Sequence, residues 1–391
     1  MSKALAERII RKIGDSHDGW IPFEEYMREA LYAPELGYYE SGEVFGASGD
    51  YITGVDVGPW LALGMADLIE WGWQQLGSPK QWTLIEQGGG EGRLLCAVLR
   101  ILGKRDIVMP ARIHAVERSA HMGLRQQAAY AELGGDVQGV DVQLYTQLDE
   151  LPVSEHALFF CNELPDAFPV RCFSWRDGRM HERGVGLAAA GEFAWRDNPS
   201  DDTQGLPQID EGIVSAWPEG YISEWNPHLA DWQAAVSRSM QRGFVFCVDY
   251  GYAQSEYYRP NRIEGTLLAH LKHEPVTDIL ADPGSRDITA HIDFTALGRA
   301  GEDAGLDMGC WMTQGAWLAQ SPGVQAYIQQ AVTQSSAESA AVMASAKRML
   351  MPQGMGEMFK LSVQAKGLDA GAPDFLTSFN RVAALGLGRW M

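Results

Sequence analysis

A cluster of glycines constrains what this chain can fold into more than any other feature. The segment Glu86-Gln87-Gly88-Gly89-Gly90-Glu91-Gly92 follows a short β-prone run that starts at Trp82. After it, apolar residues recur at helical spacing on one face: Leu94, Leu95, Val98, Leu99 and Leu102. The pattern predicts a strand, a glycine turn and a helix. Because glycine has no side chain, such a turn lets the backbone pass close to a ligand. The competing interpretation is a merely flexible turn.

The spacing of the glycines separates two classes of cofactor. Dinucleotide sites need G-x-G-x-x-G, which places a pyrophosphate on the helix N-terminus. In this chain the third place of that frame is Arg93, so the dinucleotide pattern fails. The pattern acidic-x-G-x-G-x-G fits at every position, with Glu86, Gly88, Gly90 and Gly92. It predicts S-adenosylmethionine, a cofactor without pyrophosphate, whose sulfonium and amino-acid end favour a carboxylate at the strand end.

A second acid supports the binding of a nucleoside. Ile113–Glu117 is a predicted strand, and Glu117 at its tip is placed to accept hydrogen bonds from two ribose hydroxyls. An acid at this place also serves NAD enzymes, so Glu117 indicates a nucleoside without choosing which one.

Alternating strands and helices predict a doubly wound, Rossmann-like α/β sheet. We expect a helical N-terminal region over residues 1–80 and a cofactor-binding domain over 81–391, with insertions at about 170–240 and 250–290. The first insertion contains a hairpin that turns at Asp177-Gly178 and a surface segment over 196–220, and loops dominate the second. Further strands are predicted at 142–145, 157–161, 243–249 and 359–365.

Composition excludes several classes of function. The formal net charge of -20 argues against nucleic-acid binding and tolerates a basic substrate. Five scattered cysteines without a CxxC pair indicate neither a zinc site nor a disulfide framework, and no metal is expected. The chain has no apolar run of 18 residues, so no membrane span is expected. The amphipathic N-terminus is interpreted as a first helix rather than a transit peptide, because it also carries acidic residues.

Two acids directly follow the predicted fourth strand. Glu163 and Asp166 lie at the carboxyl edge of the sheet, where ligands of this fold collect. Residues three apart in a turn could face one pocket. The structural alternative is that both acids only cap the next helix.

At this point the chain resembles the MidA family of class I methyltransferases, which includes a mitochondrial complex I assembly factor that methylates a protein arginine. The resemblance runs nearly end to end, through blocks that keep their order and spacing. The blocks are 21–27 with 31–34 and 37–39, 49–53, 116–119 with Gln126, 162–170, 249–251, 265–267 and 287–294.

The resemblance implies a methyltransferase that uses S-adenosylmethionine and acts on a protein arginine. A guanidinium has a pKa above 12, so it needs carboxylates that hold it and accept its proton, and Glu163 with Asp166 are the catalytic candidates. The cofactor candidates are Glu86, Gly88, Gly90, Gly92, Glu117 and Asn162. The substrate-binding candidates are Asp50, Thr53, Asp249 and His291. Each of Asp50, Asp249 and His291 also has a plain structural interpretation, as a turn, a cap or a core histidine.

Two other functions stay open at the level of sequence. One is an assembly factor or chaperone that binds the cofactor without catalysis, and the other is a methyltransferase for a small molecule. The partner that the resemblance implies is a protein substrate, such as a respiratory-complex subunit. The implied location is the cytoplasm for a bacterial member of the family, or the mitochondrial matrix for a eukaryotic one.

Overall fold

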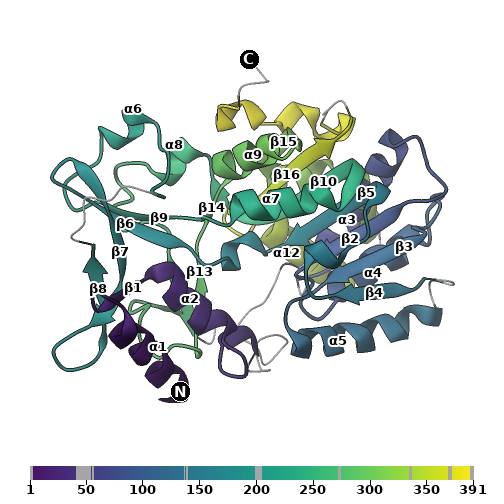
Figure 1. The fold of residues 1–391 in the computed structure, drawn as a ribbon. Coiled ribbons are helices and arrows are strands. Elements are labelled where there is room, and N and C mark those ends of the chain that lie inside the picture. Colours follow the sequence, from purple (N-terminus) through teal and green to yellow (C-terminus); the bar gives the residue numbers. More distant parts are fainter. Residues whose placement is uncertain are drawn as a thin grey trace. The chain divides into compact units, whose positions relative to one another are not determined.

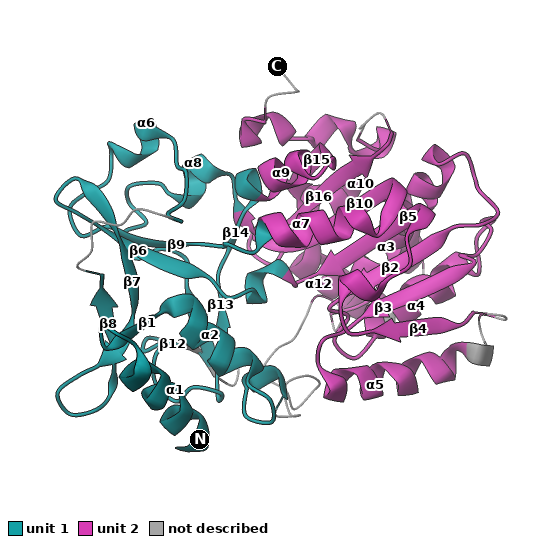
Figure 2. Ribbon diagram, in the orientation of Figure 1, with its two compact units in different colours: residues 1–51, 165–229, 252–296 teal, residues 52–164, 230–251, 297–391 magenta. Residues whose placement is uncertain are grey.

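The chain is divided between two structural units, each built from three separate segments. A computed structural model describes residues 3–40, 54, 57–135, 137, 140–198, 205–271, 274–333, 337–368 and 372–387. Unit 1 comprises Met1–Tyr51, Pro165–Leu229 and Tyr252–Ala296, and unit 2 comprises Ile52–Leu164, Ala230–Gly251 and Leu297–Met391 (Figure 2). The first 80 residues, which the sequence groups as one helical region, are therefore shared between the units.

Unit 2 contains the α/β sheet that the sequence predicts. Its strands follow the order β15-β16-β10-β5-β2-β3-β4 (Figure 1). Strands β2, β3, β4, β5 and β10 run parallel, whereas β16 is antiparallel to both β10 and β15. Their bounds are β2 Thr83–Gln87, β3 Arg112–Val116, β4 Val142–Tyr145, β5 Ser154–Asn162, β10 Met240–Tyr252, β15 Asp307–Thr313 and β16 Phe359–Lys366. Strand β15 was not predicted, because its Met-Gly-Cys-Trp-Met run shows no alternation of apolar and polar residues.

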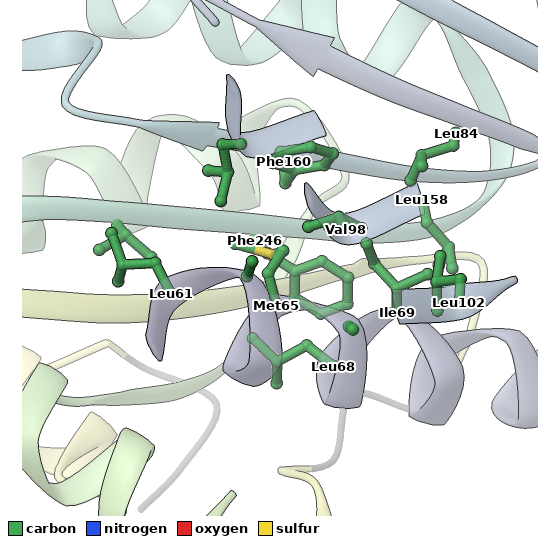
Figure 3. Close-up of a cluster of buried hydrophobic side chains, with 14 of the residues drawn as sticks. Leu61, Met65, Leu68, Ile69, Leu84, Val98, Leu102, Leu158, Phe160 and Phe246 are labelled. Atoms are coloured by element: carbon green, nitrogen blue, oxygen red, sulfur yellow. The ribbon is translucent and has the colours of Figure 1, made fainter. Parts of the chain in front are cut away.

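Helices cover both faces of this sheet. Leu158 and Phe160 of β5 belong to the large hydrophobic core that α3 and α4 also line (Figure 3). Phe159, between them, points to the other face and packs edge-on against Trp232 of α7, with ring centroids 6.4 Å apart. A strand buried on both faces is apolar throughout, as predicted for β5. The helices are α3 Trp60–Gln75, α4 Arg93–Leu102, α5 Ala120–Ala131, α7 Leu229–Arg238, α9 Phe294–Asp303, α10 Gln314–Gln320, α11 Pro322–Thr333 and α12 Ala337–Leu350.

Close packing of β10 against β5 leaves no room for a side chain at Gly243. A Cβ atom there would lie 1.9 Å from the carbonyl oxygen of Ala157. We expect Gly243→Ala to lower the free energy of unfolding by about 3 kcal/mol, because two paired strands must separate to admit the methyl group. Denaturant titration measures the change.

The matched control is Gly123→Ala. Gly123 lies within α5, and a Cβ atom there meets no other atom within 4 Å. This substitution should raise the free energy of unfolding by up to about 1 kcal/mol, because alanine favours the helix over glycine. Equal effects of the two substitutions would contradict the packing argument.

Unit 1 is built around an antiparallel sheet in the order β1-β7-β6-β9, with β8 paired to β7. The hairpin of β6 and β7 turns at Asp177 and Gly178, as the sequence predicts, and both residues have positive φ, 51° and 73°. Helix α1 buries Leu5, Ile9 and Ile13 on one face, which confirms the predicted first helix. The bounds are α1 Lys3–Asp15, β1 Trp20–Pro22, α2 Phe23–Tyr32, β6 Arg171–Arg176, β7 Arg179–Leu187, β8 Phe193–Asp197 and β9 Ile222–Trp225.

Among the described residues of 196–220, Trp217 contradicts the prediction of a surface insertion. Trp217 is only 6% exposed and belongs to an aromatic core of unit 1, where its ring stacks on Tyr221. The Asp, Pro and Gly residues around it hid this anchor. A short helix, α6 Glu211–Val214, lies just before it.

Loops make up most of the described residues of 250–290, as predicted, but short regular elements that were not predicted lie between them. Within the described residues this region forms a short helix, α8 Gln254–Tyr257, and a three-stranded antiparallel sheet in the order β12-β11-β13. The strands are β11 Leu268–Leu271, β12 Glu274–Val276 and β13 Asp287–Thr289, followed by β14 Ile292–Asp293. Strands of two to four residues are too short to show a period in the sequence.

Candidate functional site

The predicted glycine loop joins β2 to α4 in unit 2. Gly88, Gly90 and Gly92 have positive φ angles of 70°, 54° and 77°, a left-handed backbone that favours glycine. The N–H of Gly88 donates to the carbonyl of Val116, and the N–H of Gly92 donates to the carbonyl of Gly89. The alternate spacing of the glycines in the sequence therefore reflects three separate left-handed residues in one turn.

The three glycines differ in what a side chain would meet. A Cβ atom at Gly88 would lie 2.7 Å from the side chain of Leu164, and one at Gly92 would lie 2.8 Å from the ring of Tyr130. A Cβ atom at Gly90 would meet no protein atom within 4 Å. Gly88 and Gly92 are thus required by the protein's own packing. The Cβ position of Gly90 faces open space, so a ligand could approach the loop on this side.

Glu117 follows β3 directly and is held in place by its neighbours. Its Oε1 accepts a hydrogen bond of 2.9 Å from the N–H of Ser119, the residue that caps α5. Its Oε2 lies 3.3 Å from Nε2 of Gln126, which also donates to the carbonyl of Gly90 at 2.9 Å. Gln126 is 1% exposed and connects the acid to the glycine loop. A carboxylate oriented in this way fits the two hydroxyls of a ribose.

Glu86 is the last buried side chain of β2. It is 2% exposed, and burial raises the pKa of its carboxyl to about 8, although the hydrogen bond with Tyr130 acts in the opposite direction; the charge of Glu117 adds a smaller increase. The Tyr130 hydroxyl lies 3.4 Å from Oε2 of Glu86 and 3.3 Å from Oε1 of Gln126. The N–H of Leu95, in the first turn of α4, also donates to the Glu86 carboxyl.

The end of β5 carries the second set of predicted residues. Oε1 of Glu163 accepts a hydrogen bond of 2.9 Å from Nδ2 of Asn162, and its N–H donates to the carbonyl of Val248. Glu163 has a φ of 51°, which is uncommon for a residue with a side chain. Such backbone strain persists only where the surroundings hold it, and it is concentrated at functional sites.

Asp249 lies in β10, beside β5 in the same sheet. It is fully buried and stands opposite Lys360 of β16, itself only 6% exposed. Oδ1 of Asp249 accepts a hydrogen bond of 2.7 Å from the N–H of Tyr250. Asp249 therefore caps the N–H of the next residue, as the purely structural alternative predicts. Its cross-strand neighbour is a buried cation.

Asp166 and the segment of His291 come together in unit 1. Asp166 is buried in a short 3-10 helix, η4 Pro165–Ala167, and its carbonyl accepts a 3.0 Å hydrogen bond from the N–H of Ala290. The Tyr32 hydroxyl donates to the carbonyl of Ala167 at 2.7 Å. Three of the blocks that carry the family resemblance thus meet at this place, namely 31–34, 162–170 and 287–294. Glu163 belongs to unit 2 and Asp166 to unit 1, so their joint action stays a prediction.

A buried acid supports His291. The N–H of His291 donates to Oγ1 of Thr266 at 2.9 Å, and its ring stacks on Tyr252. Thr266 in turn donates through both its N–H and its hydroxyl to Glu224, whose side chain is fully buried and whose pKa is raised by burial. The remaining substrate candidates, Asp50 and Thr53, lie outside the described residues.

Sequence reasoning assigned no role to Tyr130, Trp232 or Gln126, the last of which it noted only within a family block. Nε1 of Trp232 donates to Oε1 of Gln87 at 2.9 Å and so ties α7 to the start of the loop. Tyr130 follows Gln126 by four residues on α5, so both lie on one helical face, and this spacing was the available signal. Nothing in the sequence indicated that this face turns toward the glycine loop.

The described residues hold no cluster of three or more His, Cys, Asp or Glu side chains that could bind a metal. The five cysteines are buried as thiols. In the same part of the chain, no helix is both long and apolar enough to cross a membrane.

Comparisons with known proteins identify the family of the chain. Residues 65–310 match the model of the family described as "Putative S-adenosyl-L-methionine-dependent methyltransferase". A protein of Burkholderia thailandensis, solved with bound S-adenosyl-homocysteine, is 28% identical, with a TM-score of 0.85 over 98% of this chain and 97% of its own. A second solved protein of that organism is 30% identical, with a TM-score of 0.83 and the same coverage.

Curated relatives are more distant in sequence. A mitochondrial protein of Drosophila melanogaster, named protein arginine methyltransferase NDUFAF7 homolog, is 26% identical over 93% of this chain and 85% of its own. The mitochondrial protein arginine methyltransferase NDUFAF7 of Danio rerio is 26% identical over 92% of this chain and 85% of its own.

Proposed function

This chain belongs to the family of S-adenosyl-L-methionine-dependent methyltransferases, and from this premise we propose that it methylates an arginine side chain of a protein. Its cofactor is S-adenosylmethionine, in line with the relative that binds S-adenosyl-homocysteine. The arginine acceptor is supported by the names of the curated relatives and by the chemistry of the residues at the end of β5.

The residues around the glycine loop fit this cofactor. Bound S-adenosylmethionine supplies a methyl group on a sulfonium, with a thioether as the leaving group. Gly90 leaves open space beside the loop, and the Glu117 carboxylate is oriented by the N–H of Ser119. In our proposal Glu117 holds the ribose hydroxyls, Gly88, Gly90 and Gly92 form the wall beside the cofactor, and Glu86 and Asn162 support that wall.

The backbone of Glu163 is the single observation that carries the acceptor assignment. A left-handed conformation costs a residue with a side chain roughly 1–2 kcal/mol, yet the hydrogen bonds of Glu163 hold it there. That conformation places a carboxylate at the carboxyl edge of the sheet, where ligands of this fold bind. A guanidinium stays protonated at neutral pH, so its attack requires a group that orients it and takes a proton. Glu163 has this role in our proposal.

Other acids and His291 complete the acceptor side. Asp166 and Asp249 are buried carboxyl groups, and His291 is held through Thr266. We assign Asp166 to catalysis with Glu163, and we assign Asp249 and His291, together with Asp50 and Thr53, to binding of the substrate. The net charge of -20 favours approach of a basic protein segment.

The test is direct identification of the methylated residue. Purified protein is incubated with methyl-labelled S-adenosylmethionine and an extract of cells that lack this chain, and the labelled protein is hydrolysed to amino acids. We expect the label in methylarginine. Label in another amino acid would contradict the arginine acceptor. Label confined to small molecules would favour a small-molecule methyltransferase.

A second experiment tests the alternative that the chain is an assembly factor without catalytic activity. Mass spectrometry compares protein methylation in cells with and without the chain. We expect loss of methylarginine from at least one protein. If a protein complex fails to assemble while methylation is unchanged, the non-catalytic alternative is favoured. A respiratory-complex subunit as the substrate and the cytoplasm as the location stay predictions from the resemblance.

A further inference from the structure

Two acids of the cofactor site are connected through a tyrosine and a glutamine. The series runs from Glu86 through Tyr130 and Gln126 to Glu117, with distances of 3.4, 3.3 and 3.3 Å between successive polar atoms. All four residues belong to unit 2. Because each contact needs one donor and one acceptor, the series has a direction, and the direction determines which acid carries a proton.

The direction is set at Gln126. One end of its amide lies 2.9 Å from the Gly90 carbonyl oxygen and 3.3 Å from the Glu117 carboxylate. Both of these groups are acceptors, so the amide NH2 must face them and the amide oxygen must face away. The oxygen therefore points to the hydroxyl of Tyr130, 3.3 Å away, and needs a donor there.

Tyr130 has one proton to donate. Burial raises the pKa of its hydroxyl far above the usual value, so the group stays protonated. If the proton is directed to Gln126, a lone pair of the Tyr130 oxygen faces Oε2 of Glu86 at 3.4 Å. If Glu86 were ionised, its carboxylate oxygen and the lone pair of Tyr130 would be two acceptors facing each other without a proton between them. In a buried place this is unfavourable. A protonated Glu86 removes the conflict, because its O–H donates to Tyr130.

The surroundings of Glu86 agree with a neutral acid. The group is buried, and Gly89 packs so closely that a Cβ atom there would lie 2.3 Å from Oε2 of Glu86. The titratable groups that face it are Tyr130 and Cys96, both neutral at pH 7, and the Glu117 carboxylate. The N–H of Leu95 donates to the carboxyl. A neutral acid satisfies that donor with its carbonyl oxygen and still donates through its hydroxyl.

We propose that Glu86 is a protonated acid in the ligand-free protein, and that Tyr130 and Gln126 relay its hydrogen bond to Glu117, which alone is the carboxylate. Glu86 is then a positioning residue that orients the relay against Gly90, and Glu117 is the charged group offered to the ribose. This inference revises the expectation that Glu86 offers a carboxylate to the sulfonium. It concerns the cofactor and is independent of which residue accepts the methyl group.

Two amide variants distinguish the acids. Calorimetry at pH 7 measures the affinity for S-adenosyl-homocysteine of the wild type, Glu86→Gln and Glu117→Gln. We expect Glu86→Gln to stay within about threefold of the wild type, because glutamine reproduces the donor and acceptor of a neutral acid. Glu117→Gln should weaken binding at least about tenfold, because it removes the charged acceptor. Equal losses in the two variants, or a larger loss in Glu86→Gln, would overturn the proposal.

The pH dependence of stability gives a readout without any ligand. The ordinary pKa of a glutamate is 4.5, and in the folded chain the pKa of Glu86 is about 8. Between these pH values the folded chain holds the Glu86 proton and the unfolded chain has lost it, so wild-type stability falls as pH rises. Glu86→Gln has no such proton. Its Tm relative to the wild type should therefore increase steadily from pH 5 to pH 8.

The matched control is Glu91→Gln, an acid of the same loop that is paired with Arg93 and Arg125. Its Tm relative to the wild type should stay level over this range. If the difference in Tm between Glu86→Gln and the wild type also stays constant from pH 5 to pH 8, the proposal is overturned. A Glu86→Gln protein that fails to fold at pH 5 would overturn it too, because the amide should replace a neutral acid without loss.

Discussion

Glu163→Gln is expected to lower the rate of methyl transfer by about 100-fold or more and to leave the affinity for S-adenosyl-homocysteine unchanged. The amide keeps the size of the side chain and can still accept the hydrogen bond from Asn162. It cannot hold a guanidinium as an ion pair or take its proton, and removal of a general base typically costs 10²–10⁴ in rate. Single-turnover assays with labelled cofactor measure the rate, and calorimetry measures the affinity.

The control for this variant is Glu35→Gln. Glu35 is an exposed glutamate that also has positive φ, 64°, but lies in unit 1, outside the sequence of the glycine loop and of β5. Its substitution should change neither rate nor affinity. If Glu163→Gln keeps the wild-type rate, Glu163 is not the group that takes the proton. If it loses cofactor affinity to the same extent as rate, the acid acts on the cofactor side instead.

Gly90→Val is expected to abolish detectable binding of S-adenosyl-homocysteine, which corresponds to a loss of at least about 100-fold, or roughly 2.7 kcal/mol. A Cβ atom at residue 90 meets no protein atom within 4 Å, so the loss is not attributed to a clash of that atom within the protein. Instead, the branched side chain would fill the space beside the loop. Calorimetry at ligand concentrations well above the wild-type Kd tests this outcome.

A second glycine separates this effect from backbone strain. Gly305 has a φ of 78°, is exposed, and also meets no atom within 4 Å at its Cβ position. Gly305→Val should cost roughly the same 1–2 kcal/mol of stability as Gly90→Val, because both force a β-branched residue into a left-handed conformation. It should bind S-adenosyl-homocysteine normally. Loss of binding in both variants would show that destabilisation, and not the position of Gly90, is responsible.

The cofactor loop was predictable because its signals are local. Gly88, Gly90 and Gly92 alternate in the sequence because alternate residues of one turn take positive φ. The strand before them and the helix after them follow from apolar periodicity within a few residues. The apolar run of β5 likewise predicted a strand buried on both faces, which the core confirms.

Other elements gave weaker signals. Strand β15 and the short strands of residues 250–290 have too few residues, or too little alternation, for a period to be visible. Trp217 was hidden in a segment of polar turn residues, although its indole fills the core of unit 1. In these places burial is decided by partners distant in the sequence, such as Phe173 and Tyr258.

The sequence by itself determined the class of the fold, the cofactor and the position of the glycine loop, to which we assign cofactor binding. Those properties depend on backbone geometry and on residue spacing, which are encoded locally. Only the tertiary structure decided how Glu86 and Glu117 differ. Glu86 and Glu117 are both acids at strand ends in the sequence, but α5 brings Tyr130 and Gln126 between them. Burial of Glu86 and the direction of those hydrogen bonds arise from packing, and packing is what distinguishes a neutral acid from a carboxylate.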